Sequence, residues 1–257
     1  MKFTFGICTT SGNEGRIINI IESIGKNKIP LDCYEIIVVG NISLPHMRAI
    51  DIKIIPFDES VKKGWITKKK NIITNAAKYE NIVYMHDYIV LTEGWYKSMC
   101  NYEDKWDLLM SRIINYDGSR FRDWALCGAW THNPFVEPNT INSLIPYDEK
   151  RLSRWMYFSG TYWVAKKNFM LENPLKESLG WGEGEDVEWS ERVRKKTNFM
   201  LNPSAVVKVN KPNKEVILKQ AKKEFLEKVY HSPNTLEGKM KEAFIKEDWK
   251  DWFGVGK

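Results

Sequence analysis

The sequence predicts an α/β domain built on a mostly parallel central sheet, with a helical extension at its C-terminus. Short apolar runs alternate with segments of helical periodicity in the first third of the chain. A polar His-Asp pair directly follows one of the apolar runs, and a Lys-rich amphipathic segment comes near the end. Strands that alternate with helices are typical of parallel sheets. We therefore expect one domain over residues 1–210 and an extension over residues 211–257 that packs on it.

The first elements follow the order strand, helix, strand, strand. Phe3 to Cys8 is an apolar run that predicts a buried strand. Ser11 to Glu14 has the S-x-x-E pattern of a capping box and predicts a helix start, with isoleucines from Ile17 to Ile24 at helical spacing. Two more apolar runs predict strands over residues 34–39 and 52–57.

The next elements bring a polar pair to the end of a strand. We expect a helix over residues 67–77, a strand over 81–85, a helix over 95–100 and a strand over 108–114. His86 and Asp87 directly follow the first of these two strands. Ligands of open parallel sheets bind beyond the carboxyl ends of the strands, so this pair lies where chemistry is expected.

The second half of the sequence is less periodic. Residues 115–155 are rich in Trp, Pro, Asn and Arg, which predicts long loops over one face of the domain. A strand is expected over 159–165, a glycine-rich turn over 180–184, a helix over 185–195 and a short strand over 205–209.

Composition excludes several classes of protein. Of the 257 residues, 43% are hydrophobic and 13% aromatic, which is too apolar for a disordered chain. No apolar run reaches the roughly 18 residues that a membrane-spanning helix needs. The first twenty residues read as a strand and a helix rather than a signal peptide, so we expect a cytoplasmic protein. The cysteines lack zinc-site spacing, and no disulfide is expected.

Most of the net charge of +6 lies in the last fifth of the chain, since residues 208–257 carry twelve lysines and eight acidic residues. The amphipathic helix of the extension has an apolar stripe of Leu218, Ala221, Phe225 and Val229. Docking of the stripe on the sheet domain is the favoured interpretation. A peripheral contact with the inner face of an anionic membrane and a nucleic-acid contact are the alternatives.

Two clusters of polar residues suit an anionic ligand. The loop from Thr9 to Glu14 combines hydroxyls, a glycine and a helix N-terminus, which can receive an anion, although an ordinary helix cap fits as well. Lys68 to Asn71 begins the second helix, and its cations suit a diphosphate or a solvated helix face. The chain has no Walker A or dinucleotide-binding glycine pattern, which disfavours nucleotide hydrolases and dinucleotide dehydrogenases.

Two further clusters carry acidic residues. Tyr84 to Tyr88 is an apolar strand that ends in His and Asp, which suits Mn²⁺ or Mg²⁺ or, alternatively, a surface turn. Gly180 to Trp189 holds four acids, three glycines and two tryptophans within ten residues. An ionised carboxylate at a helix N-terminus can act as a general base, and Trp offers an apolar face to a sugar, although an acidic helix cap is the simpler interpretation.

In this order, the four clusters resemble nucleotide-sugar glycosyltransferases of the GT-A fold, particularly the family-two-like enzymes. The resemblance covers residues 1–210 and implies a Rossmann-like α/β/α sandwich. The second strand of this family ends in Asp-Asp-Gly-Ser, where this chain has Gly40-Asn41-Ile42-Ser43, so Asn41 replaces the acid that meets the nucleoside. The donor-binding residues that the resemblance implies are Thr9, Thr10, Asn13, Glu14, Asn41, Lys70 and Gly160.

The resemblance also implies a divalent metal, Mn²⁺ or Mg²⁺. Tyr84 to Tyr88 is similar to the Phe-Leu-Asp-x-Asp metal motif of the family, with His86 at its first acidic position and Tyr88 at its last. Asp87 is then the main metal ligand and His86 a second one. A downstream His often completes the site in these enzymes, and His231 is the first His available here.

The segment from Gly180 to Trp189 is the most specific match. It resembles the Gly-Trp-Gly-x-Glu-Asp segment of galactosyltransferase-like enzymes, with Glu183 as an additional residue. The resemblance implies that Glu185 binds the acceptor or the donor sugar and that Asp186 is the catalytic base. Trp181 and Trp130 are candidates for a platform under the acceptor sugar.

The function that follows is transfer of a sugar from a nucleoside diphosphate sugar, with UDP as the expected nucleotide, to a hydroxyl acceptor with inversion. The family favours an acceptor in bacterial surface glycan synthesis. Modified DNA, the acceptor of phage glycosyltransferases, is an alternative because the extension is basic. A non-catalytic glycan- or nucleic-acid-binding module is the alternative from another class, since His86 and Tyr88 depart from the metal motif.

Overall fold

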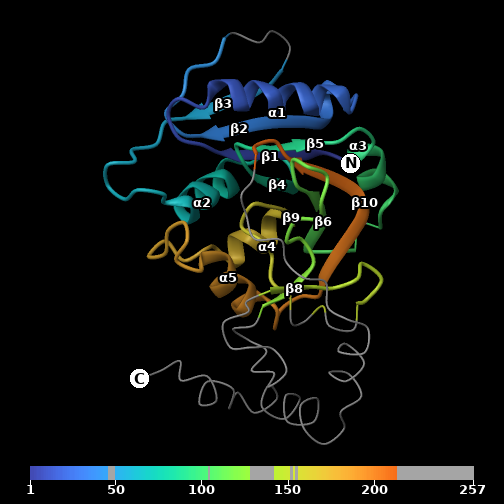
Figure 1. Cartoon of the computed structure of the whole chain (residues 1–257). Coiled ribbons are helices and arrows are strands. Elements are labelled where there is room, and N and C mark those ends of the chain that lie inside the picture. The colour runs from blue at the N-terminus through green and yellow to red at the C-terminus, as the bar shows by residue number, and fades with distance from the viewer. Residues whose placement is uncertain (46–49, 104, 128–141, 151–152, 154–155, 213–257) are drawn as a thin grey trace, which may run out of the picture.

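The centre of the molecule is an eight-stranded sheet with the strand order β3-β2-β1-β4-β9-β6-β10-β5 (Figure 1). Parallel pairs join β1 to β2 and β4, β2 to β3, and β6 to β10. The predicted α/β class with a mostly parallel sheet is therefore confirmed. The computed structural model describes residues 1–45, 50–103, 105–127, 142–150, 153 and 156–212.

The first half of the chain supplies the parallel part of the sheet. The strands β1, β2 and β4 are buried along their whole length, which explains why they read as continuous apolar runs. The elements of this half are β1 (Phe3–Cys8), α1 (Glu14–Lys26), a 3-10 helix (Leu31–Cys33), β2 (Tyr34–Val39), β3 (Ile52–Ile55), α2 (Ile66–Ala76), β4 (Asn81–His86), β5 (Ile89–Leu91) and α3 (Trp95–Asn101).

The second half contributes a strand that runs against its neighbours. Strand β9 lies between β4 and β6 and is antiparallel to both, and β5 is antiparallel to β10 at the sheet edge. The long loop region contains a small two-stranded sheet, β7 with β8. The elements of this half are β6 (Leu108–Ile114), β7 (Ala125–Cys127), β8 (Asn142–Leu144), β9 (Tyr162–Lys166), α4 (Lys167–Glu172), α5 (Glu185–Val193) and β10 (Phe199–Val209).

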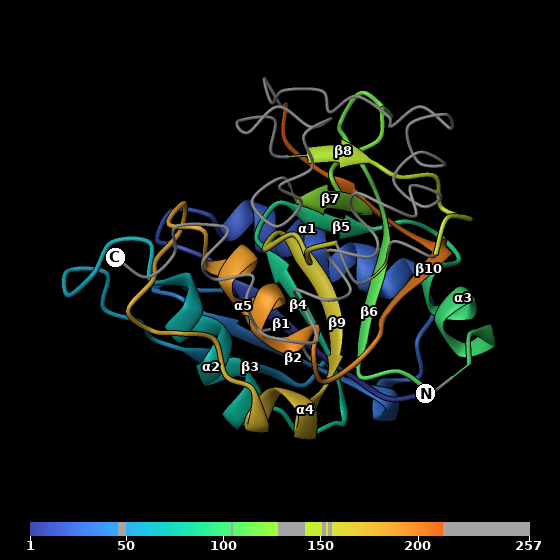
Figure 2. The same ribbon diagram turned by 90° about the horizontal axis from the view of Figure 1, so that it is seen from below.

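Helices cover both faces of the sheet. On one face, Phe3 of β1 packs on Trp95 of α3 with ring centroids 5.1 Å apart. On the other, Gly6 of β1 lies so close to α2 that an added Cβ would be 2.3 Å from Cγ2 of Ile73. Figure 2 shows α2, α4 and α5 in front of the sheet and α1 behind it. The three-layer α/β/α arrangement is confirmed.

The start of α1 differs from its prediction. The helix begins at Glu14, and its N-cap is Asn13, whose side chain makes no capping bond. The Asn13 amide donates instead to the Thr10 hydroxyl at 2.9 Å. Ser11 lies in the preceding turn, so the expected capping box is wrong. The hydroxyls of this loop are consequently organised around the end of β1 rather than around the helix.

The predicted extension over residues 211–257, with its apolar stripe, lies almost entirely outside the described residues. The division of the chain at residue 210 therefore stays a prediction. None of the helices in the described ranges is long and apolar enough to cross a membrane.

Candidate functional site

The candidate site lies at the edge where β1, β2, β3 and β4 end. The register aligns Cys8 at the end of β1 with Val39 on one side and with His86 on the other. Strand β9 runs in the opposite direction, so its beginning reaches this edge, and the His86 N–H donates to the Thr161 carbonyl at 3.1 Å. The loops after four strands and the loop before a fifth therefore meet here.

A hollow of about 560 Å³ opens over the ends of β1, β2 and β3. Asn41 lines it, as the resemblance implies for a nucleoside contact, together with Ser11. The preceding Gly40 is required by close packing, because a Cβ there would lie 2.6 Å from the Thr9 carbonyl oxygen. The remaining lining residues are Pro56, Phe57, Asp58, Glu59 and Ser60.

Asp58 and Glu59 are acidic residues of this hollow that the sequence analysis missed. A hydrogen bond from Ser60 lowers the pKa of the Asp58 carboxyl, which keeps this exposed group ionised. Glu59 forms an ion pair with the buried ammonium of Lys69, which also donates to the Thr9 carbonyl at 2.7 Å. Their position directly after β3 was the signal, since it matches that of Asn41 after β2.

Asp87 is almost buried at the end of β4 and is held by side chains from other elements. Its Oδ2 accepts a hydrogen bond from the Thr9 hydroxyl at 2.8 Å. Its Oδ1 lies 3.5 Å from Nη1 of Arg16, a half-exposed residue in α1. The expected donor loop and the expected metal ligand are thus in direct contact, and Arg16 is a basic group that the sequence analysis did not single out.

His86 lies beside Asp87 with a buried imidazole. Its Nε2 has no hydrogen-bond partner among the described residues. Burial lowers the pKa of His86 well below its usual value, and the nearby charges of Lys70 and Lys211 lower it further. The ring is therefore neutral, with a nitrogen lone pair available to a ligand.

Lys70 is fully buried, so it does not lie on a solvated helix face. Its ammonium donates to the Gly160 carbonyl at 2.7 Å and lies 4.2 Å from the ring centroid of Trp163. Burial lowers the pKa of Lys70, while the negative charges of Glu185 and Asp186 oppose that shift. Lys70 thus links the start of β9 to the acidic segment, and its contact with a donor stays a prediction.

Asp186, in α5, contacts Gly160, the glycine whose carbonyl Lys70 bonds. Its Oδ2 accepts from the Gly160 N–H at 2.8 Å, and its Oδ1 from the Val187 N–H at 2.9 Å. Glu185, which is 6% exposed, has a raised pKa because of burial and the neighbouring Asp186. Glu185 therefore keeps its proton to higher pH than an exposed glutamate does.

The glycine-rich turn places these acids at the N-terminus of α5. Gly182 and Gly184 have φ angles of +80° and +73°, which favour glycine. Glu183 accepts from the Gly180 N–H at 2.5 Å and pairs with Lys62, and these contacts lower its pKa. Glu183 is therefore a structural residue of the turn. Trp181 is 70% exposed.

The structure thus gathers most of the predicted residues along one strand edge. Thr10 and Asn13 bond each other there, and Glu14 lies in the first turn of α1. His231 and Trp130 lie outside the described residues. Within the described ranges, no group of three or more His, Cys, Asp or Glu side chains forms a metal cage.

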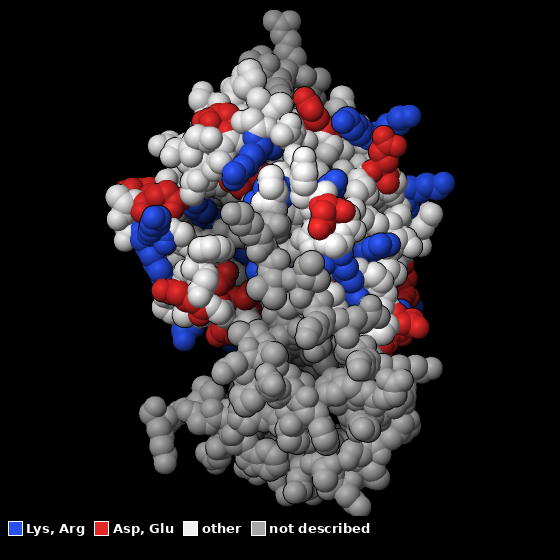
Figure 3. All heavy atoms as spheres, viewed as in Figure 1, with Lys and Arg blue, Asp and Glu red and all other residues white. Residues whose placement is uncertain are grey.

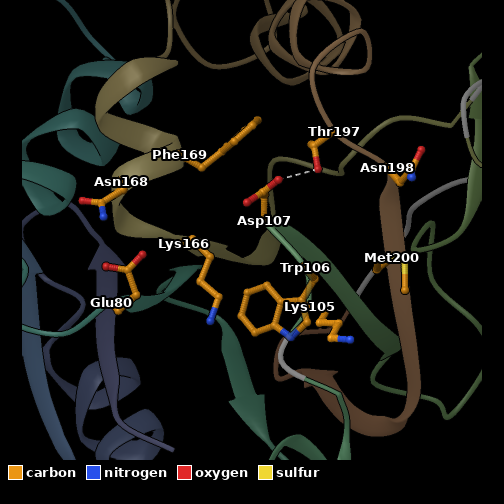
Figure 4. A pocket seen from close by; sticks show the side chains of 10 residues that line it. All are labelled: Glu80, Lys105, Trp106, Asp107, Lys166, Asn168, Phe169, Thr197, Asn198 and Met200. Carbon is orange, nitrogen blue, oxygen red and sulfur yellow. Dashed lines mark hydrogen bonds between the residues drawn. The ribbon is translucent and has the colours of Figure 1, made fainter.

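A second hollow, of about 570 Å³, lies at the opposite edge of the sheet (Figure 4). Several of its polar groups already have partners: Thr197 donates to Asp107 at 2.7 Å within the hollow (Figure 4), and Lys166 donates to Asn81, outside it, at 2.9 Å. Its position, where β4, β6 and β10 begin, is far along the strands from Asp87 and Asp186. We therefore assign no catalytic role to it.

Basic and acidic side chains are interspersed on the described part of the face in Figure 3. A nucleic-acid interface normally gathers Lys and Arg into a patch or stripe. The described part of this face therefore gives no support to a DNA acceptor. The Lys-rich extension lies outside the described residues.

No protein-family model and no curated protein sequence matches the chain. Solved structures do. S. aureus TarS 1-349 in complex with UDP-GlcNAc matches with a TM-score of 0.58 and 15% identity, over 84% of this chain and 60% of that chain. GalNAc-T7 with UDP, GalNAc and Mn²⁺ matches with a TM-score of 0.58 and 11% identity, over 88% of this chain and 46% of that chain.

These likenesses show that the chain has the GT-A fold of the glycosyltransferases. The expected fold is thereby confirmed. The chain spans less than two thirds of the length of these structures. It covers 60% and 46% of the two chains above and 37% of another TarS structure.

Proposed function

We propose that the protein is a glycosyltransferase that moves a sugar from a nucleoside diphosphate sugar, UDP-linked, to an acceptor hydroxyl. One observation carries this proposal. The Gly160 backbone lies between the Lys70 ammonium and the Asp186 carboxylate, at the strand edge that Asp87 and Thr9 share. An anchored carboxylate can take up the proton of an attacking hydroxyl, and a nearby fixed cation stabilises negative charge at the site.

The donor lies across the strand ends in this proposal. Its nucleoside enters the hollow beside Asn41, where Asp58 adds a hydrogen-bond acceptor. Its diphosphate lies over Thr9 and the α1 N-terminus, which favours negative charge. Its sugar lies toward Gly160, whose missing side chain lets the Asp186 carboxylate approach the Gly160 backbone. TarS, which has the same fold, was crystallised with UDP-GlcNAc.

The transfer step uses the acids of α5. The acceptor hydroxyl oxygen attacks the anomeric carbon while the bond from that carbon to the diphosphate oxygen breaks. The hydroxyl proton passes to Asp186, and Glu185 holds the acceptor by a hydrogen bond. A single displacement inverts the anomeric configuration. Trp181 is an exposed aromatic surface on which the acceptor sugar can pack.

Asp87 and His86 fit a divalent ion that shares its coordination with substrate phosphates. Mg²⁺ commonly uses one or two carboxylates, phosphates and water rather than a full protein cage, and Mn²⁺ accepts imidazole as well. The unpartnered Nε2 of His86 and the Asp87 carboxylate provide such donors. A bound ion would neutralise charge on the leaving diphosphate. GalNAc-T7 was crystallised with Mn²⁺.

The acceptor we propose is a bacterial surface glycan, with transfer at the cytoplasmic side. Thermal unfolding of the full chain tests donor and acceptor together. A ligand that binds the folded state raises the melting temperature, so a panel of nucleoside diphosphate sugars should stabilise the chain, with UDP-sugars most effective. Stabilisation by DNA or glycan alone, with no donor effect, would instead favour a binding module.

A further inference from the structure

The ion pair between Arg16 and Asp87 places a guanidinium where the donor's diphosphate is expected. Arg16 belongs to the first turns of α1, and its Nη1 lies 3.5 Å from Asp87 Oδ1. Thr9 fixes the other carboxylate oxygen, so Asp87 holds the guanidinium over the end of β1. The Arg16 side chain is 48% exposed, whereas that of Asp87 is 12% exposed, so the cation faces the open side of the pair.

Two lysines of α2 near the Arg16–Asp87 pair, Lys69 and Lys70, have buried side chains that bond groups inside the protein. Lys69 is 2% exposed and bonds the Thr9 carbonyl and Glu59. Lys70 is fully buried and bonds the Gly160 carbonyl. Both ammonium groups reach backbone carbonyls, and neither side chain is exposed. Arg16 is thus the cation of α1 and α2 that combines contact with Asp87 and exposure to solvent.

A guanidinium suits a diphosphate better than it suits one carboxylate oxygen at 3.5 Å. It carries five N–H donors in a planar fork that matches the oxygens of phosphate, and such charge-assisted pairs are among the strongest hydrogen bonds. Asp87 alone would repel an arriving diphosphate. Arg16 offsets that repulsion, and Asp87 in turn fixes the position of Arg16.

We propose that Arg16 is a diphosphate-binding residue, and that it lets the protein bind a nucleoside diphosphate without a divalent ion. The inference rests on the proposed function and adds to it the group that contacts the diphosphate. Since Arg16 and a metal ion would share Asp87, the guanidinium and the ion are alternative partners of one carboxylate. Metal then improves binding by the wild type only modestly and becomes essential when Arg16 is removed.

Isothermal titration of the full chain with UDP and with uridine, in chelator and in Mn²⁺, tests this. The wild type should bind UDP in chelator. Arg16→Ala should weaken UDP binding in chelator by about tenfold to a hundredfold, the worth of a charge-assisted hydrogen bond. Mn²⁺ should restore much of that loss. In chelator, the affinity of Arg16→Lys for UDP should fall between those of the wild type and Arg16→Ala, because lysine keeps the positive charge but lacks the planar set of N–H donors.

Two controls separate the contact from other effects. Lys26→Ala removes one positive charge from the other end of the same helix and should leave UDP binding unchanged. Uridine carries no phosphate, so its affinity should not respond to Arg16→Ala. An equal loss for uridine and UDP would mean that the substitution disturbs the loop, and would overturn the proposal.

Two other outcomes are decisive. Wild-type binding of UDP that needs Mn²⁺, or an Arg16→Ala chain that binds UDP in chelator as the wild type does, would also overturn it. Failure of the proposed function has a different signature, in which no variant binds UDP or any nucleoside diphosphate sugar under either condition.

Discussion

The two aspartates of the candidate site are held by different chemistry. Asp87 is fixed by the Thr9 hydroxyl and the Arg16 guanidinium, both of which are side chains from elsewhere in the chain. Asp186 is fixed by two backbone N–H groups, those of Gly160 and Val187. A backbone donor survives substitution of its own residue, whereas a side-chain donor does not. The Asp186 side, which the proposed function assigns to the acceptor, is therefore robust in geometry, and the Asp87 side, assigned to the donor, can be retuned by single substitutions.

Asp186→Asn gives the sharpest test of the acceptor side. The Asn carbonyl can still accept one of the backbone hydrogen bonds, so the fold and donor binding should persist. Turnover should fall by ~10²–10⁴, the usual contribution of a general base. Glu188→Gln on the same helix, where Glu188 pairs with Arg192, is the matched control. Near-normal turnover would place the base elsewhere, with Glu185 the next candidate.

Asp87→Ala tests the donor side. In Mn²⁺, the variant should bind the nucleoside diphosphate sugar roughly tenfold to a hundredfold more weakly than the wild type, because it loses both the carboxylate ligand of the metal and the partner that positions Arg16. Calorimetry with and without Mn²⁺ measures the affinity of each variant for the nucleoside diphosphate sugar. Asp51→Ala, which removes an exposed carboxylate paired with Lys78, is the control. An Asp87→Ala chain whose affinity responds to Mn²⁺ as the wild type's does would show that Asp87 is not the metal ligand.

Gly160→Ala tests the close contact between the Gly160 backbone and the carboxylates of α5. The new Cβ would lie 3.2 Å from Asp186 Oδ2 and 3.4 Å from Glu185 Oε1. We expect these carboxylates to shift slightly and turnover to fall by about threefold to tenfold, since small misplacements are costly. Gly25→Ala, at a position with open space, should have no such effect. Unchanged turnover would show that catalysis does not depend on the close contact of Gly160 with these two carboxylates.

Glu185→Gln should have the smallest effect, visible in stability. Because folding raises the pKa of Glu185 above its ordinary value of 4.5, its ionisation disfavours the folded state as the pH rises through the raised pKa. The neutral amide escapes this cost. Denaturant titrations should therefore show the variant gaining stability relative to the wild type from pH 4 to pH 8. A constant difference across this range would show that Glu185 is not perturbed.

The sequence predicted the parallel half of the fold well. Strands such as 34–39 and 108–114 are mostly apolar runs, and their observed bounds match. The direction of β9 was not predictable, because an apolar run specifies burial but not orientation. The short β5 and α4 were also missed, since three and six residues carry little periodicity.

The candidate site was predictable where its residues follow strands. His86 and Asp87 were found in this way, as was Asn41. Arg16 was not, because a long side chain on a helix reveals its partner only when the helix is packed. The burial of Lys70 was likewise set by tertiary contacts with Gly160 and Trp163.

The reversed direction of β9 gives the molecule a replaceable part. Strand β6 ends, and β9 begins, at the same edge as Asp87, so the chain from residue 115 to residue 161 leaves this edge and returns to it. Phe121, Trp124 and Ile145 of that excursion are part of the core, so it is insertions or exchanges at its exposed positions that need not move the sheet. Under the proposed function, acceptor preference can therefore diverge through one contiguous stretch of gene, while the loops after β1, β2 and β3 that would face the nucleotide are inherited unchanged.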